Sequence, residues 1–551
     1  MTADVPVDQN PYNSKDRRRQ IERAFKEWPF RSSGRGVGSV PGVLTSRLRE
    51  TLEVSGPIFS LFGLYLASRP DWIPLQDCLE LGAIQDRSPA MTGTSVRARF
   101  LQELGRPPEQ LFLSFDETPD QSRLTFQTHK ARLVDGTPVN INIARPFDAD
   151  EMEGETRLLS LLEPVFAAEG WTDLPFEEAI SDFQRILPRM LTEPVSFESL
   201  DLLAEDEKQF HHLAVPRAYR DYSGRTVRTC ERLSGWTLAE IIQANDFNDL
   251  DQIRQGRTPL DLLGLTPGDI ARRICQVWLQ QAFYGSVYPI ALHPTEIVML
   301  TTHQIAFTGG QFATLPTSTK ENVRNYLLAC AIPDPDRAYA CLTQEMEEAD
   351  RAQAEQGLRN RFRQIVPFRD GPWSQTGSGD TLAEHLFVHW RLSREFGYHV
   401  RIHMRDFYRG LFAVTRQTQQ LVLGRDTLKE GLNDLRYTVG MSEMRDMMDV
   451  RVWQDTANAY AMSLIHLPHL LNEAISKTPT EDPRPPKTGE DSGRGIGVSS
   501  RLIGLFSLLV VTVFVSRHLT QALGENAWVQ NVSTGTLIVI GLLALRLIYR
   551  K

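Results

Sequence analysis

The spacing of apolar residues predicts helices over most of the chain. Leu44, Leu48 and Leu52 recur four residues apart, and the stretch 58–66 that follows is apolar almost throughout. Leucines four apart share one face of a helix, and a helix that is apolar all round must be buried. Helical spacing also marks residues 270–283 and several segments between 320 and 475. We therefore expect a large, mainly helical protein.

A shorter stretch has the pattern of paired strands. Residues 122–146 read SRLTFQTHKARLVDGTPVNINIARP, in which two alternating runs flank Asp135 and Gly136. An Asp-Gly pair between alternating runs is a strong signal for a β-hairpin. Residues 221–224 are expected to form a second turn between strands. Helices and paired strands together predict an α+β fold.

The pattern changes again near the C-terminus. Residues 476–500 are rich in proline, glycine and charge, which predicts a disordered linker. Two apolar runs follow, at 502–515 and 536–545. Each is shorter than the roughly 20 residues that cross a bilayer, but flanking small residues extend both. We expect a transmembrane helical hairpin at 501–551; a single such run is also compatible with a buried core helix.

Basic residues beside these runs predict their orientation. Arg494 and Arg501 precede the first run, and Arg546, Arg550 and Lys551 lie in or after the second. Cytoplasmic flanks of membrane helices carry an excess of Lys and Arg. We therefore expect localisation to the inner (cytoplasmic) membrane, with the folded domain on the cytoplasmic side.

Composition narrows the function further. The chain has 551 residues and a net charge of −9, which argues against a general nucleic-acid binder. Five scattered cysteines without CxxC spacing are expected to be reduced thiols in the core. Residues 1–39 form a polar, basic arm, for which contact with anionic headgroups and a solvated tail are both open. An acidic cluster at 345–350 is expected to be a solvated helix face.

The stretch 56–71, GPIFSLFGLYLASRPD, resembles the signature of the UbiB (AarF) family of atypical protein-kinase-like proteins. That family writes it roughly GPTFIKLGQxLSTRPD, and the matching positions here are Gly56, Pro57, Phe59, Gly63, Leu66, Arg69, Pro70 and Asp71. The lysine and glutamine of the family's KxGQ core are replaced by Leu61 and Leu64. The resemblance implies a helix across the active cleft of a kinase lobe, and Leu61 is expected to pack there because it has no charge for phosphates.

Two further segments resemble the family's N-lobe. Residues 122–146 follow AxASIAQVHRARLxDGxxVAVKVxRP and keep its glutamine and histidine as Gln127 and His129. The strand lysine that pairs nucleotide phosphates in the family falls on Asn142. An amide cannot supply a fixed positive charge to a phosphate chain. Residues 215–238 resemble the family's following strands and place the boundary between the lobes near 233–238.

Residues 286–300, SVYPIALHPTEIVML, resemble the family's catalytic loop, GFFHADPHPGNLLV. The loop aspartate falls on Ala291, or on Ile290 if the register shifts by one. The metal-binding asparagine falls on Glu296, and the metal-binding aspartate of the next motif falls on Thr308. The resemblance therefore implies a degenerate active site with no catalytic residue and no metal site.

Four residues are possible remnants of the family's site: Gln127, His129, Glu193 and His293. A carboxylate such as Glu193 is usually a surface residue, and a histidine such as His293 in a packed loop is usually a structural residue. Across the cleft we expect apolar side chains to collapse together or to leave an apolar groove: Leu61, Phe62 and Leu64 on one side, Leu124 and Phe126 on the other.

The expected architecture is an α+β, bilobal protein-kinase-like fold with additions at both ends. Its expected parts are the basic arm (1–39), an N-terminal helical extension (40–120), a kinase-like N-lobe (121–236), a helical C-lobe (237–475), the linker (476–500) and two transmembrane helices (501–551).

The resemblance implies a membrane-anchored pseudokinase that acts as a scaffold or regulator in isoprenoid-quinone (ubiquinone) or membrane-lipid metabolism. Phosphoryl transfer depends on charge positioned around phosphates and metal, and Asn142, Ala291 and Thr308 do not supply it. We expect no cofactor and no nucleic-acid partner. The expected partner is a membrane lipid or quinone intermediate; a canonical UbiB paralogue or quinone-biosynthesis proteins are further candidates.

Two alternatives are open. The chain is a diverged but active ATPase or small-molecule kinase if Glu296, Glu193 and Lys130 serve as substitutes, and only then are ATP and magnesium needed. It is also possible for a membrane protein of unrelated function to use the same fold.

Overall fold

The computed structural model describes residues 14–26, 43–147, 149–168, 174–192, 194, 196–246, 259–332, 334–347, 352–365 and 381–448. The chain divides into two compact units, Met1–Leu435 and Arg436–Lys551, and of the second only the end of α20 (Thr427–Met448) is described. Glu193, the expected linker and both expected membrane runs lie outside the described residues. Within the described ranges, no helix is both long and apolar enough to cross a membrane.

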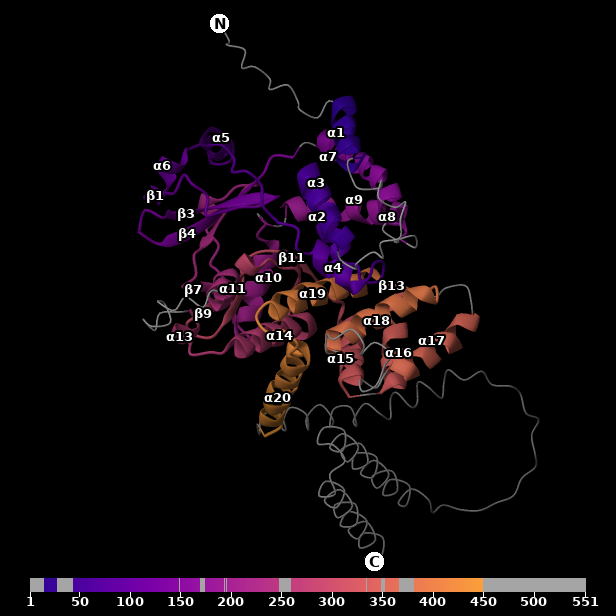
Figure 1. The fold of residues 1–551 in the computed structure, drawn as a ribbon. Coiled ribbons are helices and arrows are strands. Elements are labelled where there is room, and N and C mark those ends of the chain that lie inside the picture. Colours follow the sequence, from indigo (N-terminus) through magenta and orange to yellow (C-terminus); the bar gives the residue numbers. More distant parts are fainter. Residues whose placement is uncertain are drawn as a thin grey trace, which may run out of the picture. The chain divides into compact units, whose positions relative to one another are not determined.

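Four helices open the described chain: α1 (Ser14–Lys26), α2 (Val43–Ser55), α3 (Pro57–Ala67) and α4 (Leu75–Leu81). Helices α2, α3 and α4 pack against one another (Figure 1). Leu48 and Leu52 are fully buried, as their spacing predicts. Gly63 permits this packing, because a Cβ atom at that position would lie 2.3 Å from Ile84 Cδ1.

Arg69 and Asp71, which follow α3, are structural residues. The Arg69 guanidinium donates to both Asp71 carboxylate oxygens at 2.8 and 2.7 Å and lies 3.2 Å from the centre of the Trp72 ring. The Tyr65 hydroxyl, one turn earlier, donates to Asp182 at 2.6 Å. The polar groups of Tyr65, Arg69 and Asp71 thus have hydrogen-bond partners although they are buried. Their role is to hold α3 to its neighbours.

Phe62 does not face the cleft, which corrects one expectation. Its ring packs edge-on against Phe176 and Phe183 of α9 (Phe176–Thr192), with ring centres 6.2 and 5.2 Å apart. Helix α9 has its own strongly one-sided apolar pattern, and that face provides the aromatic surface on which Phe62 packs.

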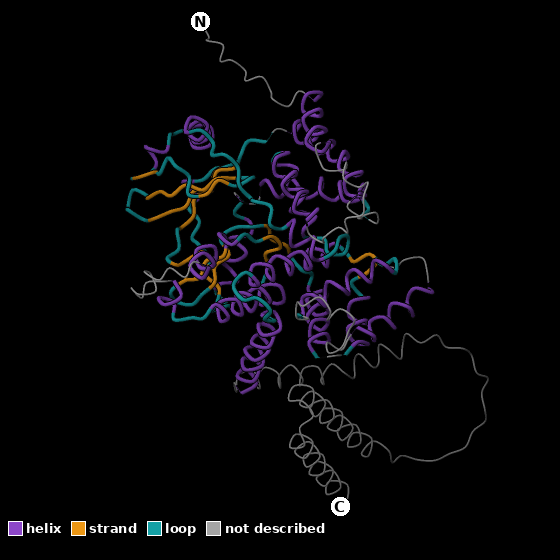
Figure 2. The backbone as a smooth tube through the Cα atoms, viewed as in Figure 1, coloured by secondary structure: helices purple, strands orange, loops and turns teal. Residues whose placement is uncertain are grey.

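The N-terminal sheet is antiparallel and has the order β1-β3-β4-β6, with β2 beside β3. Figure 2 shows the strands in orange. Its strands and flanking helices are α5 (Gly93–Leu104), α6 (Pro108–Leu111), β1 (Ser114–Phe115), β2 (Gln121–Ser122), β3 (Phe126–Arg132), β4 (Pro138–Ala144) and β6 (Val227–Glu231). The hairpin predicted from Asp135 and Gly136 joins β3 to β4. Gly136 has φ of 86°, a conformation that glycine adopts without strain.

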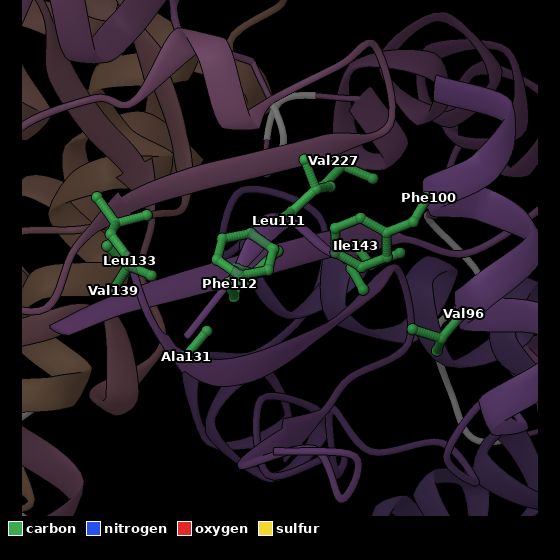
Figure 3. Close-up of a cluster of buried hydrophobic side chains, with 10 residues drawn as sticks. Val96, Phe100, Leu111, Phe112, Ala131, Leu133, Val139, Ile143 and Val227 are labelled. Atoms are coloured by element: carbon green, nitrogen blue, oxygen red, sulfur yellow. The ribbon is translucent and has the colours of Figure 1, made fainter. Parts of the chain in front are cut away.

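One face of this sheet carries the core of the N-terminal part (Figure 3). Val139, Ile141 and Ile143 alternate along β4 and are fully buried, and Phe100 of α5 covers them. Alternate residues of a strand point to one face, so the pattern itself specifies the register. Each such side chain contributes roughly 1.5–3 kcal/mol on burial.

The segment between β4 and β6 and the helices beyond β6 complete the first unit. The first segment contains α7 (Ala149–Leu158), α8 (Glu163–Ala168), α9, α10 (Glu198–Glu207) and β5 (Leu213–Ala214). The helices beyond are α11 (Leu238–Asp246), α13 (Pro259–Leu263), α14 (Pro267–Tyr284), α15 (Thr317–Ala331), α16 (Pro335–Thr343), α17 (Ala352–Ile365), α18 (Leu382–Glu395), α19 (Ile402–Gln419) and α20.

Short strands lie among these helices. They are β7 (Gly235–Thr237), β8 (Tyr288–Ala291), β9 (Ile297–Leu300), β10 (Ile305–Phe307), β11 (Gln311–Ala313), β12 (Met346–Glu347) and β13 (His399–Val400). They form a β5-β10-β9-β7 sheet and the pairs β11-β8 and β12-β13. The central helix α14 begins with a Thr266–Asp269 capping box and buries Trp278 completely.

Two surface expectations are wrong for individual residues. Glu345 is 4% exposed rather than solvated, because its carboxylate accepts hydrogen bonds from Thr319 and Asn322 of α15. Arg17 of the basic arm is also buried, where it pairs with Glu155 of α7. Arg17 is therefore committed to packing and is not available to lipid headgroups.

Candidate functional site

Two cavities lie between the N-terminal sheet and the helical part. The larger has a volume of about 980 Å³ and is bounded by α3, the loop after α4, the end of β8 and α19. The smaller, about 190 Å³, lies beside β3, β4, β7 and β9. Phe126 and Glu296 line both, so the two spaces meet at these side chains.

The smaller cavity is where the expected nucleotide cleft falls, and Asn142, Glu296 and Thr308 all line it. Asn142 sits opposite Thr128 in the β3-β4 register and accepts a hydrogen bond from the Thr128 hydroxyl at 2.9 Å. Its amide nitrogen donates to the Pro194 carbonyl at 3.3 Å. The side chain at the strand-lysine position is therefore neutral and already hydrogen-bonded within the protein.

Thr308 and Ala291 occupy the two expected aspartate positions. The Thr308 backbone nitrogen donates to the Glu296 carbonyl at 2.9 Å, so Thr308 lies beside Glu296. Ala291 ends β8 and lines the larger cavity. Gly310, with φ of 104°, lies against it, and a Cβ atom there would lie 2.3 Å from the Ala291 carbonyl oxygen. The structure thus brings the predicted positions together, without a carboxylate on either Ala291 or Thr308.

Arg123 provides the main charge at the junction of the two cavities. Its guanidinium pairs with Glu296 and with Asp86, and Nε lies 2.7 Å from Asp86 Oδ2. The backbone nitrogen of Leu124 donates to the other Asp86 oxygen at 2.9 Å. A buried cation thus joins the loop before β3 to the residue at the metal-asparagine position.

The pKa values at this junction favour the charged pair. Burial opposes ionisation of Asp86, but attraction to Arg123 and a smaller effect of His293 hold the pKa of Asp86 below its ordinary value. Burial also opposes the charge of Arg123, yet Asp86 and Glu296 raise the Arg123 pKa overall. Asp86 and Arg123 are therefore both charged at neutral pH, and the Arg123 guanidinium also contacts the Glu296 carboxylate.

Three of the possible remnants have structural partners. His129 donates from Nδ1 to the Asp116 carbonyl at 2.8 Å and contacts Gln127 through Nε2 at 2.7 Å. The Gln127 oxygen accepts from the Met91 backbone nitrogen at 2.8 Å. Burial lowers the pKa of His129, so the ring is neutral, with one proton fixed on Nδ1.

His293 begins the short 3-10 turn Pro294–Glu296. Its Nδ1 accepts from the Thr295 backbone nitrogen at 3.3 Å, and its own backbone nitrogen donates to Glu296 at 2.9 Å. Burial, and then repulsion by Arg123, lower the pKa of His293 to about 3. A ring with that pKa is a poor proton acceptor near neutral pH.

Sequence reasoning missed three cations at the site: Arg123, Arg228 and Arg416. Arg228 of β6 pairs with Asn142 in the sheet register, and its guanidinium donates to the carbonyls of Ser196 and Thr308 at 3.0 and 3.1 Å. Arg123 replaces a small residue of the family's alanine-rich loop, and that change of size and charge was the available signal. Arg416 lies on α19 in a helical pattern that shows only amphipathicity.

The larger cavity has part of the apolar lining that the sequence predicts. Its apolar lining residues include Leu61, Leu64, Ile84, Phe126 and Phe412. Leu124, expected beside Phe126, is buried and does not line this cavity. Leu61 is 4% exposed, whereas Leu64 is half-buried. The space is open rather than collapsed, so the groove, and not the filled cleft, is what forms.

Comparisons with known proteins agree on a kinase-like domain. Residues 83–342 match the family model described as "ABC1 atypical kinase-like domain". The "Probable protein kinase UbiB" of Tolumonas auensis is 28% identical over 290 residues, which is 51% of this chain and 50% of that protein. The "Probable protein kinase UbiB" of Aeromonas salmonicida is 27% identical over 305 residues, 54% of this chain and 50% of that protein. The chain thus spans about half the length of these curated relatives.

A solved structure of the complex of Rv3197 with erythromycin, from Mycobacterium tuberculosis, aligns with 61% of this chain and 84% of the Rv3197 chain. The sequence identity is 15% and the TM-score is 0.36. Residues 83–342 form an ABC1 atypical kinase-like domain with an α+β kinase-like fold, and the similarity to the UbiB proteins supports the resemblance of this chain to the UbiB/AarF family.

Proposed function

We propose that this chain is a membrane-anchored pseudokinase, a non-catalytic scaffold or regulator in isoprenoid-quinone or membrane-lipid metabolism. The relatives' names place UbiB proteins among probable kinases, and this chain departs from a kinase at the positions that carry charge. The observation that carries the proposal is the Arg123–Glu296 ion pair between the N-terminal sheet and the catalytic-loop segment.

The pair supports inactivity for an electrostatic reason. Phosphoryl transfer needs metal ions and cations around the phosphates, with carboxylates free to hold the metal. Among the positions equivalent to metal ligands, Glu296 alone has a carboxylate, and Arg123 already neutralises it. A divalent cation would have to displace a buried guanidinium that also pairs with Asp86.

The space also supports the proposal. The smaller cavity, about 190 Å³, is below the roughly 300–1,000 Å³ typical of ligand pockets. Two of the three substitutes required by the active alternative have partners elsewhere: Lys130 pairs with Asp120, and Glu296 with Arg123. The third, Glu193, lies outside the described residues.

Membrane anchoring by the runs at 502–515 and 536–545 is part of the same proposal. Their apolar length and basic flanks favour the inner membrane, with the kinase-like domain on the cytoplasmic side. A lipid or quinone intermediate, or a UbiB paralogue with intact phosphate-binding residues, is the partner that this role requires.

ATP turnover tests the proposal. The full chain, purified in a neutral detergent, should release no phosphate from magnesium-ATP above the level of its Glu296→Gln variant, with Arg97→Gln of the exposed Arg97–Glu109 pair as a surface control. Turnover that Glu296→Gln abolishes and Arg97→Gln leaves intact would establish the active alternative instead.

A further inference from the structure

The larger cavity contains an arginine that has no partner among the described residues. Arg416 of α19 lines it and is half-buried, yet its guanidinium makes no hydrogen bond or ion pair with any residue that the structure describes. Burial is the cause that lowers the pKa of Arg416, to about 10, so it is still charged at neutral pH. A desolvated cation without a counter-charge is costly, and proteins rarely keep one without a use.

The other charged groups of the cavity do not compensate Arg416. Asp86 and Glu296 both pair with Arg123, and Asp120 pairs with Lys130. Arg409 pairs with Asp406. Exposed Arg87, also on the wall, has no ion-pair partner in the described ranges. The cavity therefore carries an excess of positive charge, located at Arg416 inside and Arg87 at its exposed edge.

The surroundings of Arg416 are apolar and closely fitted. Gly82, which ends α4, lies against the guanidinium, and a Cβ atom there would be 2.9 Å from Arg416 Nε. Phe412 and Ala413 lie one turn before Arg416 on α19, and Ile84 lies just beyond Gly82. All three line the cavity together with Leu61. The cationic Arg416 thus shares this cavity with several apolar side chains.

We propose that this cavity binds an amphipathic anion, with its carboxylate or phosphate on Arg416 and its apolar body along Leu61, Ile84 and Phe412. Charge complementarity requires the anion, and the apolar wall requires the hydrophobic body. The cavity volume of about 980 Å³ accommodates a ligand of lipid or prenylated-aromatic size. This inference deepens the proposed function, on which it rests for the ligand's role in lipid metabolism.

Thermal unfolding of the full chain in a neutral detergent tests this site with oleate as the probe and methyl oleate as its neutral counterpart. Oleate should raise the Tm in a concentration-dependent way, because a ligand that binds the folded state stabilises it. Methyl oleate should have little effect. Arg416→Gln should require at least tenfold more oleate for the same shift, whereas Arg97→Gln should respond as the parent does.

The unliganded variant separates binding from a structural role. Arg416→Gln removes a half-buried charge that has no partner among the described residues, so its Tm without oleate should equal or exceed that of the parent. A lower Tm would indicate that the protein itself holds the guanidinium, and it would count against the site. Equal responses to oleate and methyl oleate, or an unchanged oleate response in Arg416→Gln, would overturn the proposal.

Further arms identify the anion and separate this inference from the proposed function. Oleyl phosphate in place of oleate shows whether a phosphate or a carboxylate is preferred. A rise in Tm with either ligand supports the site if the rise depends on Arg416. Magnesium-ATP is a competitor in the same assay. If it displaces oleate, and if its binding requires Arg416, then Arg416 binds nucleotide phosphates and the lipid site is contradicted. ATP turnover alongside an intact oleate response would remove the pseudokinase role and leave the amphipathic-anion site standing.

Discussion

At the scale of single residues, Arg123 determines what the site can do. It is placed where the family has small residues over the nucleotide phosphates, and it pairs with Asp86 and Glu296 instead. The hairpin sequence predicts β3 and β4 but not this contact, because Glu296 lies 173 residues away in sequence. The uncharged residues at the predicted positions Asn142 and Thr308 are visible in the sequence, whereas the ion pair between Arg123 and Glu296 is not.

Removing Arg123 should be costly. Arg123→Met leaves Asp86 and Glu296 as two buried carboxylates without a counter-charge. Breaking a buried pair from one side typically costs about 3–5 kcal/mol, and we expect a loss of that size in the free energy of unfolding. Urea denaturation measures it, with Arg97→Met of the exposed Arg97–Glu109 pair as a control that should lose less than about 1 kcal/mol. An Arg123→Met variant as stable as that control would show that the network is not formed.

The pH dependence of the same network has a definite sign. The pKa of Asp86 is lower in the folded state than in the unfolded state, where it is about 3.9. Ionised Asp86 therefore stabilises the folded protein above about pH 3.9, and this stabilisation is lost as the pH falls through the folded pKa. The difference in unfolding free energy between the parent and Asp86→Asn should therefore be largest near neutral pH and shrink below about pH 4. A difference that grows on acidification would contradict the assigned ionisation.

At the scale of elements, α3 shows what sequence patterning can and cannot predict. The all-apolar stretch correctly predicts a buried helix, and the packing of Leu48 and Leu52 follows from their spacing. Phe62 was assigned to the wrong side, because the position of α9 depends on contacts more than 100 residues apart in sequence. Arg416 was missed because a lack of partners is a three-dimensional property.

Restoring the family residues on α3 tests how this helix packs. Leu61→Lys combined with Leu64→Gln places a charge at a position that is 4% exposed, and we expect a loss of several kcal/mol, with Leu61→Lys alone accounting for most of it. Val54→Lys on α2 is the matched control, since Val54 is 77% exposed and should change stability by less than about 0.5 kcal/mol. A double variant as stable as Val54→Lys would place Leu61 in water.

At the scale of the whole molecule, the kinase-like fold follows from motifs whose order is more informative than any single match. The ABC1 match covers 83–342, whereas the helix with the altered KxGQ motif precedes it and forms one wall of the larger cavity. The domain boundaries, the degenerate-site assignment and the membrane hairpin stay predictions.

Membrane attachment is tested by fractionation. The full chain should sediment with membranes, and a chain that ends at 499 should appear in the high-speed supernatant, because the deletion removes both apolar runs. A full chain that stays in the supernatant, or a truncated chain that still sediments as folded protein, would contradict the anchor.

The central claim, that the kinase-like cleft no longer accepts nucleotide, is tested most directly by calorimetric titration of magnesium-ATP into the full chain. We predict no saturable heat at nucleotide concentrations up to about 1 mM, a weak-binding limit of roughly −4 kcal/mol. Saturable one-to-one binding at sub-millimolar nucleotide, lost in Arg228→Gln beside Asn142, would contradict it.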